Sequence, residues 1–237
     1  MSTEPVPEST PHADLDAGVN SDAAHAGVRW SIVVPVKRPE YAKTRLADAV
    51  GEFRPHVARA FAADTIAAAL ACTVVSTVTV VTDDEEAAAE ARTLGAAVIA
   101  DTPASGLNAA LRHGAATVRT RRPDAAVASL SADLPALRAD ELKRVLTAAT
   151  MYPTSFLADA VGIGTTLYAC LPGAEFDPRF GGRSRAAHRA AGAVELDVPG
   201  VPSVRRDIDT AVDLWDAMRI GLGPRTESVI VQLDAAF

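Results

Sequence analysis

Short runs of β-branched residues alternate with alanine-rich stretches along this chain, and that alternation constrains the fold more than any other feature. Strands that alternate with helical patterns are the sequence mark of a sheet covered by helices on both faces. We therefore predict an α/β fold. The expected strands are residues 31–36, 78–82, 97–100, 125–129, 155–157 and 165–169, and the expected helices are residues 55–71, 84–94, 107–118, 140–149 and 184–191.

The length and composition indicate one folded domain. The chain has 237 residues, of which 49% are hydrophobic, which suffices for one sizeable core. Residues 1–28 are rich in Pro, Ser, Asp, Ala and Gly without apolar periodicity, so we expect a disordered N-terminal tail. We expect a domain over residues 29–226 and a C-terminal tail over residues 227–237. Cys72 and Cys170 are expected in the core, with no disulfide.

Charge and hydropathy limit the classes of partner. The net charge of −7 argues against nucleic acid, because proteins that bind it usually carry a basic surplus. The chain contains no signal-peptide core and no apolar stretch of membrane-spanning length. We therefore expect no membrane partner and a cytoplasmic location. The sequence does not indicate an oligomeric state.

Three aspartates form a candidate metal site. Asp207-Ile208-Asp209 would direct both carboxylates to one face if it is a strand, while Ile208 packs into the core. Asp133 follows the strand expected at 125–129. Mg²⁺ prefers oxygen ligands and takes few carboxylates, filling its other positions with water and phosphate oxygens. The alternative is that Asp209 caps the next helix, since Thr210 and Asp213 have capping-box spacing.

A cationic loop follows the first expected strand. Lys37, Arg38, Lys43 and Arg45 lie within nine residues, and two of the chain's three lysines are among them. Such a cluster suits a triphosphate, although it is also compatible with a solvated, cationic helix start. Neither the glycine-rich phosphate loop nor the dinucleotide-binding glycine motif is present.

Two further segments are candidate ligand sites. Asn108 carries the paired donor and acceptor that can read a base or ribose edge, and it is equally suited to cap a helix. Gly181, Gly182 and Ser184 open an expected helix, where free amides bind anions. Together with Thr165 they are a candidate acceptor site, or alternatively a flexible turn capped by Ser184. We expect a structural role for His188, because no nucleophile elbow accompanies it.

These motifs together resemble the CofC/FbiD guanylyltransferases of coenzyme F420 biosynthesis, which share the wider fold of the molybdenum-cofactor guanylyltransferases. The resemblance covers about residues 30–226. It rests on Val36-Lys37 with Ala42-Lys43-Thr44-Arg45-Leu46, on Asp133-Leu134-Pro135-Ala136-Leu137, on Gly164-Thr165, on Phe180-Gly181 with Ser184 and His188, and on Asp207-Ile208-Asp209-Thr210.

The resemblance implies a three-layer, Rossmann-like nucleotidyltransferase fold with a mixed, mostly parallel sheet. It implies Mg²⁺ on Asp133, Asp207 and Asp209, which with Lys37 form the catalytic set. Lys37, Lys43 and Arg45 would face the phosphates of GTP, beside which Asn108 is our further candidate contact. Thr165, Gly181 and Ser184 would hold the acceptor. Arg183 and Arg185 depart from the family pattern, which implies less charge there.

The implied reaction transfers GMP from GTP to a phosphorylated three-carbon acid and releases pyrophosphate. The high ratio of arginine to lysine and the abundant alanine suggest a GC-rich, actinobacterial genome. We therefore expect phosphoenolpyruvate as acceptor, with 2-phospho-L-lactate or 3-phosphoglycerate as alternatives. A downstream enzyme of the F420 pathway is the implied protein partner. Transfer to a pterin phosphate and a non-catalytic nucleotide-binding module are competing hypotheses.

Overall fold

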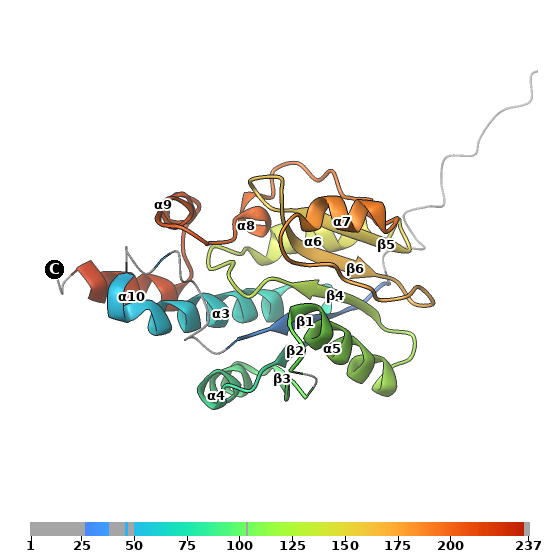
Figure 1. The fold of residues 1–237 in the computed structure, drawn as a ribbon, viewed down its shortest axis with the longest axis horizontal. Coiled ribbons are helices and arrows are strands. Elements are labelled where there is room, and N and C mark those ends of the chain that lie inside the picture. Colours follow the sequence, from blue (N-terminus) through green and yellow to red (C-terminus); the bar gives the residue numbers. More distant parts are fainter. Residues whose placement is uncertain (1–26, 38–45, 47–49, 103, 235–237) are drawn as a thin grey trace, which may run out of the picture.

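A mixed sheet forms the centre of the molecule (Figure 1). The computed structural model describes residues 27–37, 46, 50–102 and 104–234. Within these residues the sheet has seven strands in the order β3-β2-β1-β4-β6-β5-β7. β6 is antiparallel to both β4 and β5, whereas the other pairs are parallel. The strands are β1 (Trp30–Pro35), β2 (Val75–Val81), β3 (Ala97–Ile99), β4 (Ala126–Leu130), β5 (Thr154–Ala158), β6 (Thr165–Cys170) and β7 (Val194–Glu195).

Helices cover both faces of the sheet because the central strands are apolar on both sides. β1 and β4 are almost wholly buried, as expected for strands covered on both faces. On one face, Ile66 of α3, Ala91 of α4 and Leu142 of α6 share a core with the sheet. On the other face, α5 and the segment before α7 complete a second core. These helices are α3 (Arg54–Ala71), α4 (Glu85–Leu94), α5 (Leu107–Arg121), α6 (Ala139–Ala149) and α7 (Ser184–Ala190).

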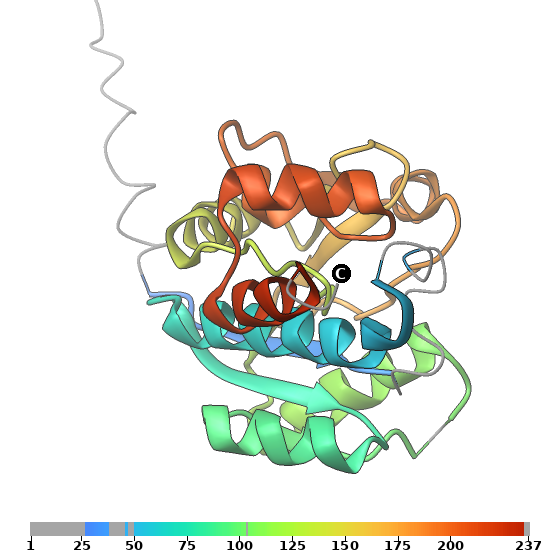
Figure 2. The same cartoon turned by 90° about the vertical axis from the view of Figure 1, so that its left-hand side faces the viewer.

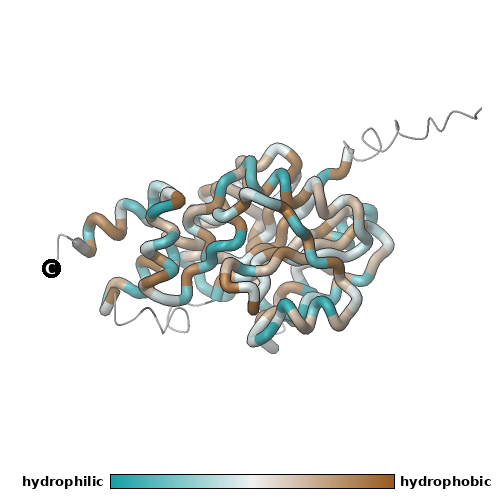
Figure 3. The backbone as a smooth tube through the Cα atoms, turned by 90° about the horizontal axis from the view of Figure 1, so that it is seen from above, coloured by the Kyte–Doolittle hydropathy of each residue, from teal (hydrophilic) through white to brown (hydrophobic). Residues whose placement is uncertain are grey.

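The last two helices make a third hydrophobic cluster on the outer side of α3. In Figure 2, α10 (Pro224–Asp234) lies along α3, with α9 (Ala211–Ile220) above them. The tube next to the C-terminus alternates between hydrophobic and hydrophilic stretches (Figure 3). Ile230 and Leu233 bury their side chains against Phe61 of α3. The expected C-terminal tail is therefore wrong as far as residue 234, because an amphipathic helix continues the domain there.

The predicted α/β class and each of the eleven predicted strands and helices are confirmed. The short helix α8 (Pro202–Arg205) and β7 were not predicted, since two to four residues show no periodicity. Cys72 and Cys170 are buried and unpaired, as expected. No helix among the described residues is long and apolar enough to span a membrane. The expected N-terminal tail lies outside the described residues, apart from Gly27 and Val28.

Candidate active site

The candidate site lies where β1 and β4 end and β6 begins. Lys37 follows β1, and Ser131 to Asp133 follow β4. Because β6 is antiparallel to β4, its first residues lie at the same edge, and the Ser131 N–H donates to the Thr166 carbonyl at 2.9 Å. Ligands of open α/β sheets bind beyond the carboxyl ends of the strands. The reversed strand therefore brings Thr165 to the ligand edge.

A buried threonine holds the turn that carries Asp133. Thr65 of α3 is fully buried, and its hydroxyl donates to the Phe61 carbonyl at 2.8 Å. The same oxygen accepts from the Leu134 N–H at 3.0 Å. The backbone beside Asp133 is thus fixed to the core of α3. Sequence reasoning missed Thr65, because a single threonine in an alanine-rich helix carries no motif.

The Asp207–Asp209 segment lies beside Asp133 but is not a strand. It connects α8 to α9, and the Ile208 N–H donates to the Asp133 carbonyl at 3.2 Å. Ile208 is buried, as predicted. The predicted strand at this point is wrong, because the pattern of one buried residue between two aspartates arises in a connection tied to Asp133.

The cap of α9 is Thr210, not Asp209. The Thr210 hydroxyl oxygen accepts from the Asp213 N–H, and the Thr210 backbone N–H donates to the Asp213 carboxylate at 2.9 Å, which completes a capping box. The alternative role for Asp209 is therefore wrong. Among the described residues, no three His, Cys, Asp or Glu side chains are gathered as a ready-made metal cage. Mg²⁺ usually binds one or two carboxylates together with substrate phosphates and water, so a closed protein cage is not required for it.

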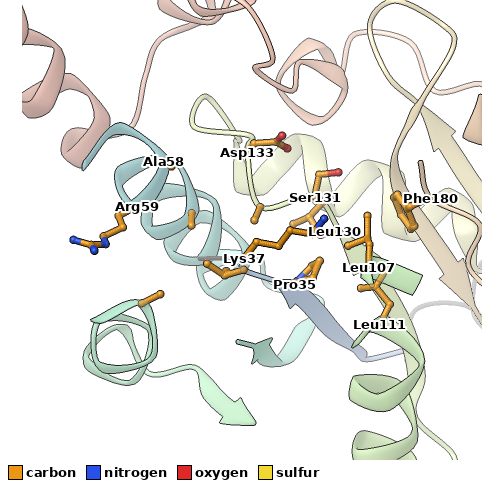
Figure 4. A pocket seen from close by; sticks show the side chains of 14 residues that line it. Pro35, Lys37, Ala58, Arg59, Leu107, Leu111, Leu130, Ser131, Asp133 and Phe180 are labelled. Atoms are coloured by element: carbon orange, nitrogen blue, oxygen red, sulfur yellow. The ribbon is translucent and has the colours of Figure 1, made fainter. Parts of the chain in front are cut away.

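A cleft runs across the end of β1 and has two lobes that share Lys37. The first lobe is lined by Lys37, Ser131, Asp133 and Phe180, and Figure 4 shows the lysine side chain reaching toward Ser131. The second lobe lies beyond β2 and β3 and is lined by two carboxylates, Asp83 and Asp101. Lys43 and Arg45, predicted to face the nucleotide phosphates, lie outside the described residues.

Asn108 fixes the loop that contains Gly181. Its amide nitrogen donates to the Phe180 carbonyl at 2.9 Å, and its amide oxygen accepts from the Phe180 N–H at 2.8 Å. The cap of α5 is Gly106, so the capping alternative for Asn108 is wrong. The GTP contact proposed for Asn108 stays a prediction, whereas its observed partner is the loop of the candidate acceptor site.

A rigid turn joins Thr165 to the start of α7. The Asp159 carboxylate accepts from the backbone N–H groups of Gly162, Ile163 and Gly164 at 2.6 to 2.9 Å. The Arg185 side chain donates to the Gly162 carbonyl at 2.9 Å. These bonds hold the β5–β6 turn against the first turn of α7, which begins with Ser184.

Arg185 forms an ion pair with a glutamate of the same chain. Arg185 and Arg189 both pair with Glu195. Partial burial raises the pKa of Glu195, but the hydrogen bonds from these two arginines hold that pKa below its ordinary value. Arg185, one of the departures from the family pattern, therefore braces the turn, and its charge is partly offset by the glutamate that it shares with Arg189.

His188 occupies the centre of this half of the site. It is fully buried, stacked on Phe156 and Tyr168 with ring centroids 5.3 and 5.0 Å away. Its Nε2 accepts from the Arg179 N–H at 2.8 Å, and its Nδ1 lies 3.1 Å from the Thr165 hydroxyl oxygen. Burial lowers the pKa of His188 to about 4, although the Ser184 backbone acts in the opposite direction. Its burial and contacts agree with the expectation that His188 is not a catalytic base.

The fold is that of known α/β nucleotidyltransferases. Two solved structures share the fold. A candidate nucleotide-diphospho-sugar transferase from Desulfovibrio desulfuricans is 18% identical, with a TM-score of 0.65 over 88% of this chain and 96% of that one. A nucleotidyl transferase from Methanothermobacter is 20% identical, with a TM-score of 0.54 over 82% of this chain and 98% of that one.

Sequence comparison narrows the class to one family. The sequence profile described as "Guanylyl transferase CofC like" matches residues 30–233. The phosphoenolpyruvate guanylyltransferase of Streptomyces coelicolor is 57% identical over 87% of this chain and 98% of its own. The enzyme of the same name from Thermomonospora curvata is 54% identical over 89% of this chain and 92% of its own. The chain belongs to the CofC-like guanylyl transferase family.

Proposed function

We propose that the chain transfers GMP from GTP to phosphoenolpyruvate, forming enolpyruvoyl-2-diphospho-5'-guanosine and pyrophosphate. The observation that carries the proposal is the antiparallel β6, which sets Thr165 beside the loop that ends in Asp133. An acceptor anion and a nucleotide can thus meet at one edge of the sheet. The relatives that share more than half of their residues with this chain are named for this reaction.

Charge sets the direction in which GTP lies in the cleft. Asp83 and Asp101 line the second lobe and would repel phosphates. A guanine base presents N1–H and N2–H groups side by side, which a carboxylate accepts, whereas adenine presents an acceptor there. We therefore place the base in the second lobe, the triphosphate at Lys37, and the α-phosphate toward Asp133 and Phe180.

Asp133, Asp207 and Asp209 are the residues that would hold Mg²⁺. Their carboxylates supply the hard oxygen ligands that this ion prefers, and the hydrogen bond from Ile208 to Asp133 keeps the two segments adjacent. When bound, the ion would offset the repulsion between the anionic acceptor and the triphosphate. Dependence on a divalent cation and the choice of Mg²⁺ are part of the proposal.

The reaction needs no protein nucleophile and no general base. A phosphate oxygen of phosphoenolpyruvate is already ionised at neutral pH, and it attacks the α-phosphorus of GTP in line. The new P–O bond forms as the bond from the α-phosphorus to the bridging oxygen breaks, and pyrophosphate leaves with its electrons. The protein contributes orientation and charge stabilisation, as in other phosphoryl transfers. In this scheme Thr165, Gly181 and Ser184 bind the acceptor.

The proposal is tested by pyrophosphate release from purified protein with Mg²⁺ and GTP. Phosphoenolpyruvate, 2-phospho-L-lactate and 3-phosphoglycerate are supplied separately, with ATP and CTP as nucleotide controls. We expect release with GTP and phosphoenolpyruvate. Release with another acid alone would correct the acceptor, whereas binding of GTP without release under any acceptor would show a nucleotide-binding module. EDTA and metal replacement test the cation.

The base assignment has its own test. An amide in place of the Asp101 carboxylate pairs poorly with guanine but can pair with xanthine, which carries a carbonyl at C2 in place of the amino group. Asp101→Asn should therefore weaken GTP binding and improve XTP binding, while Asp84→Asn, a change in the cap of α4, serves as control. If Asp101→Asn and wild type showed the same preference between GTP and XTP, the base would not bind in the second lobe.

A further inference from the structure

The position of the single imidazole proton on His188 determines which hydrogen bonds this ring makes in the candidate acceptor site. His188 is neutral at physiological pH because burial lowers its pKa to about 4, so its ring carries one proton. The group that contacts Nε2 is the Arg179 backbone N–H, 2.8 Å away, and a backbone N–H can only donate. Nε2 must therefore be the unprotonated nitrogen, and the proton resides on Nδ1.

The tautomer in turn fixes the role of Thr165. Nδ1–H faces the Thr165 hydroxyl oxygen at 3.1 Å, and it has no lone pair to accept a proton in return. Thr165 thus accepts from His188 and keeps its own proton for another partner. Among the described residues, no protein group takes that proton. A side chain that is only 6% exposed therefore retains a donor at the ligand edge of the sheet.

The ring has little freedom to adopt the other tautomer or another orientation. Phe156 and Tyr168 stack on it, and Phe180 meets its edge with a centroid distance of 5.3 Å. The Nε2–H tautomer would leave two buried donors face to face at the Arg179 N–H, and a ring flip would place Cε1–H there and leave that N–H without an acceptor. The aromatic packing and the backbone of the Gly181 loop therefore act together on one hydroxyl.

We propose that His188 is a positioning residue for the anionic acceptor, because its Nδ1–H tautomer turns the Thr165 hydroxyl into a donor directed at the substrate phosphate or carboxylate. The inference rests on the proposed function, in which Thr165 binds phosphoenolpyruvate. It adds that the specificity of this hydroxyl for an anion is set by a residue that need not touch the substrate.

The first test reads the tautomer directly. In ¹⁵N-labelled protein, the protonated and unprotonated imidazole nitrogens have distinct shifts, and His188 is identified among the chain's five histidines by comparison with His188→Gln. We expect a proton on Nδ1. A proton on Nε2 in protein that transfers GMP to phosphoenolpyruvate would overturn the inference and leave the proposed function intact.

The second test asks whether His188 acts through Thr165. Thr165→Val should raise the Kd of phosphoenolpyruvate about tenfold to a hundredfold, because a hydrogen bond to a charged group is lost, and leave the Kd of GTP unchanged. Thr165→Ser is the control that keeps the hydroxyl. His188→Gln keeps an oxygen acceptor near Arg179, and it should raise the Kd roughly threefold or more, since an unanchored hydroxyl samples three staggered positions.

The double variant separates positioning from general damage to the fold. In a Thr165→Val background, His188→Gln should produce no further change in the Kd of phosphoenolpyruvate. An equal fold-change in both backgrounds would show that His188 only supports the loop, and would overturn the inference. If His188→Gln does not fold, two measurements still test the inference. They are the ¹⁵N shifts of His188 in wild-type protein and the Kd of phosphoenolpyruvate for Thr165→Val compared with Thr165→Ser. If wild-type protein does not bind phosphoenolpyruvate, the proposed function fails first, and the acceptor role of Thr165 and His188 fails with it.

Discussion

Replacing Asn108 by alanine distinguishes a residue that holds the acceptor loop from one that contacts GTP. The substitution removes two hydrogen bonds to Phe180, of 2.9 and 2.8 Å. Each such bond contributes about 1 kcal/mol net, or about 2 kcal/mol together. Alanine is the better helix former by roughly 0.5 kcal/mol, which offsets part of the loss. We expect the free energy of unfolding to fall by about 1.5 kcal/mol.

The catalytic effect should fall on the acceptor. Phe180 precedes Gly181, so loosening it should raise the KM for phosphoenolpyruvate more than the KM for GTP. Urea unfolding and initial rates of pyrophosphate release measure the two effects. Asn108→Asp, which keeps the oxygen that accepts from the Phe180 N–H, should lie between wild type and Asn108→Ala. Thr120→Ala is a control for helix propensity, because Thr120 contacts only the Ala116 carbonyl of its own helix.

The outcome that would refute this reasoning is specific. An Asn108→Ala protein of unchanged stability, with a raised KM for GTP alone, would mean that the bonds to Phe180 contribute nothing measurable. Asn108 would then be a nucleotide contact, as its paired donor and acceptor first suggested. A rise in both KM values with lower stability would still support a structural role, since the loop borders the cleft at Phe180.

Three further outcomes are expected. Substituting any one of the three aspartates of the proposed cation site by asparagine should abolish most turnover while circular dichroism stays native; wild-type turnover of a folded triple variant would refute the cation site. Thr65→Val leaves the buried Leu134 N–H without its partner, at a cost of about 1–3 kcal/mol, and should lower turnover, whereas Thr65→Ser should retain both. The pKa of His188 falls from 6.5 to about 4 on folding, so the unfolded chain binds the extra proton between these values. Stability should therefore decline as pH falls from 6.5 to 4, by ~3 kcal/mol, and His188→Gln should flatten that part of the unfolding curve.

The strands and helices could be predicted from the sequence because each buried element requires apolar residues at a regular spacing. The β-branched strands of the parallel half and the alanine-rich helices between them lie where the pattern placed them. The prediction was wrong where a single apolar residue between polar ones gave the alternation typical of a strand. Ile208 between two aspartates resembled a strand, but it is buried in a connection between helices. Residue type alone is also no guide to burial at Trp215, a large aromatic residue that is 70% exposed on α9.

The sequence indicated which residues belong to the candidate site, but it did not indicate which of them contact one another. The order of motifs indicated Thr165, Gly181 and Ser184, but no pattern shows that His188 meets Thr165 or that Asn108 meets Phe180 across 72 positions. Such contacts depend on how β6 is inserted between β4 and β5. The short connection between residues 158 and 165 suits a hairpin and is too short for a parallel crossover, but no pattern in the sequence shows that β6 also pairs with β4.

The reversed β6 also separates the molecule into two parts that can be varied independently. The residues proposed to face the nucleotide follow the carboxyl ends of parallel strands, whereas Thr165 lies at the amino end of β6, which is antiparallel to its neighbours β4 and β5. In the proposed scheme, exchange of residues 159–165 and 178–189 between relatives would transplant an acceptor preference and would change the nucleotide cleft only at Phe180. A protein engineer seeking guanylylated analogues would therefore mutate this hairpin and α7 first and leave the parallel half of the sheet unchanged.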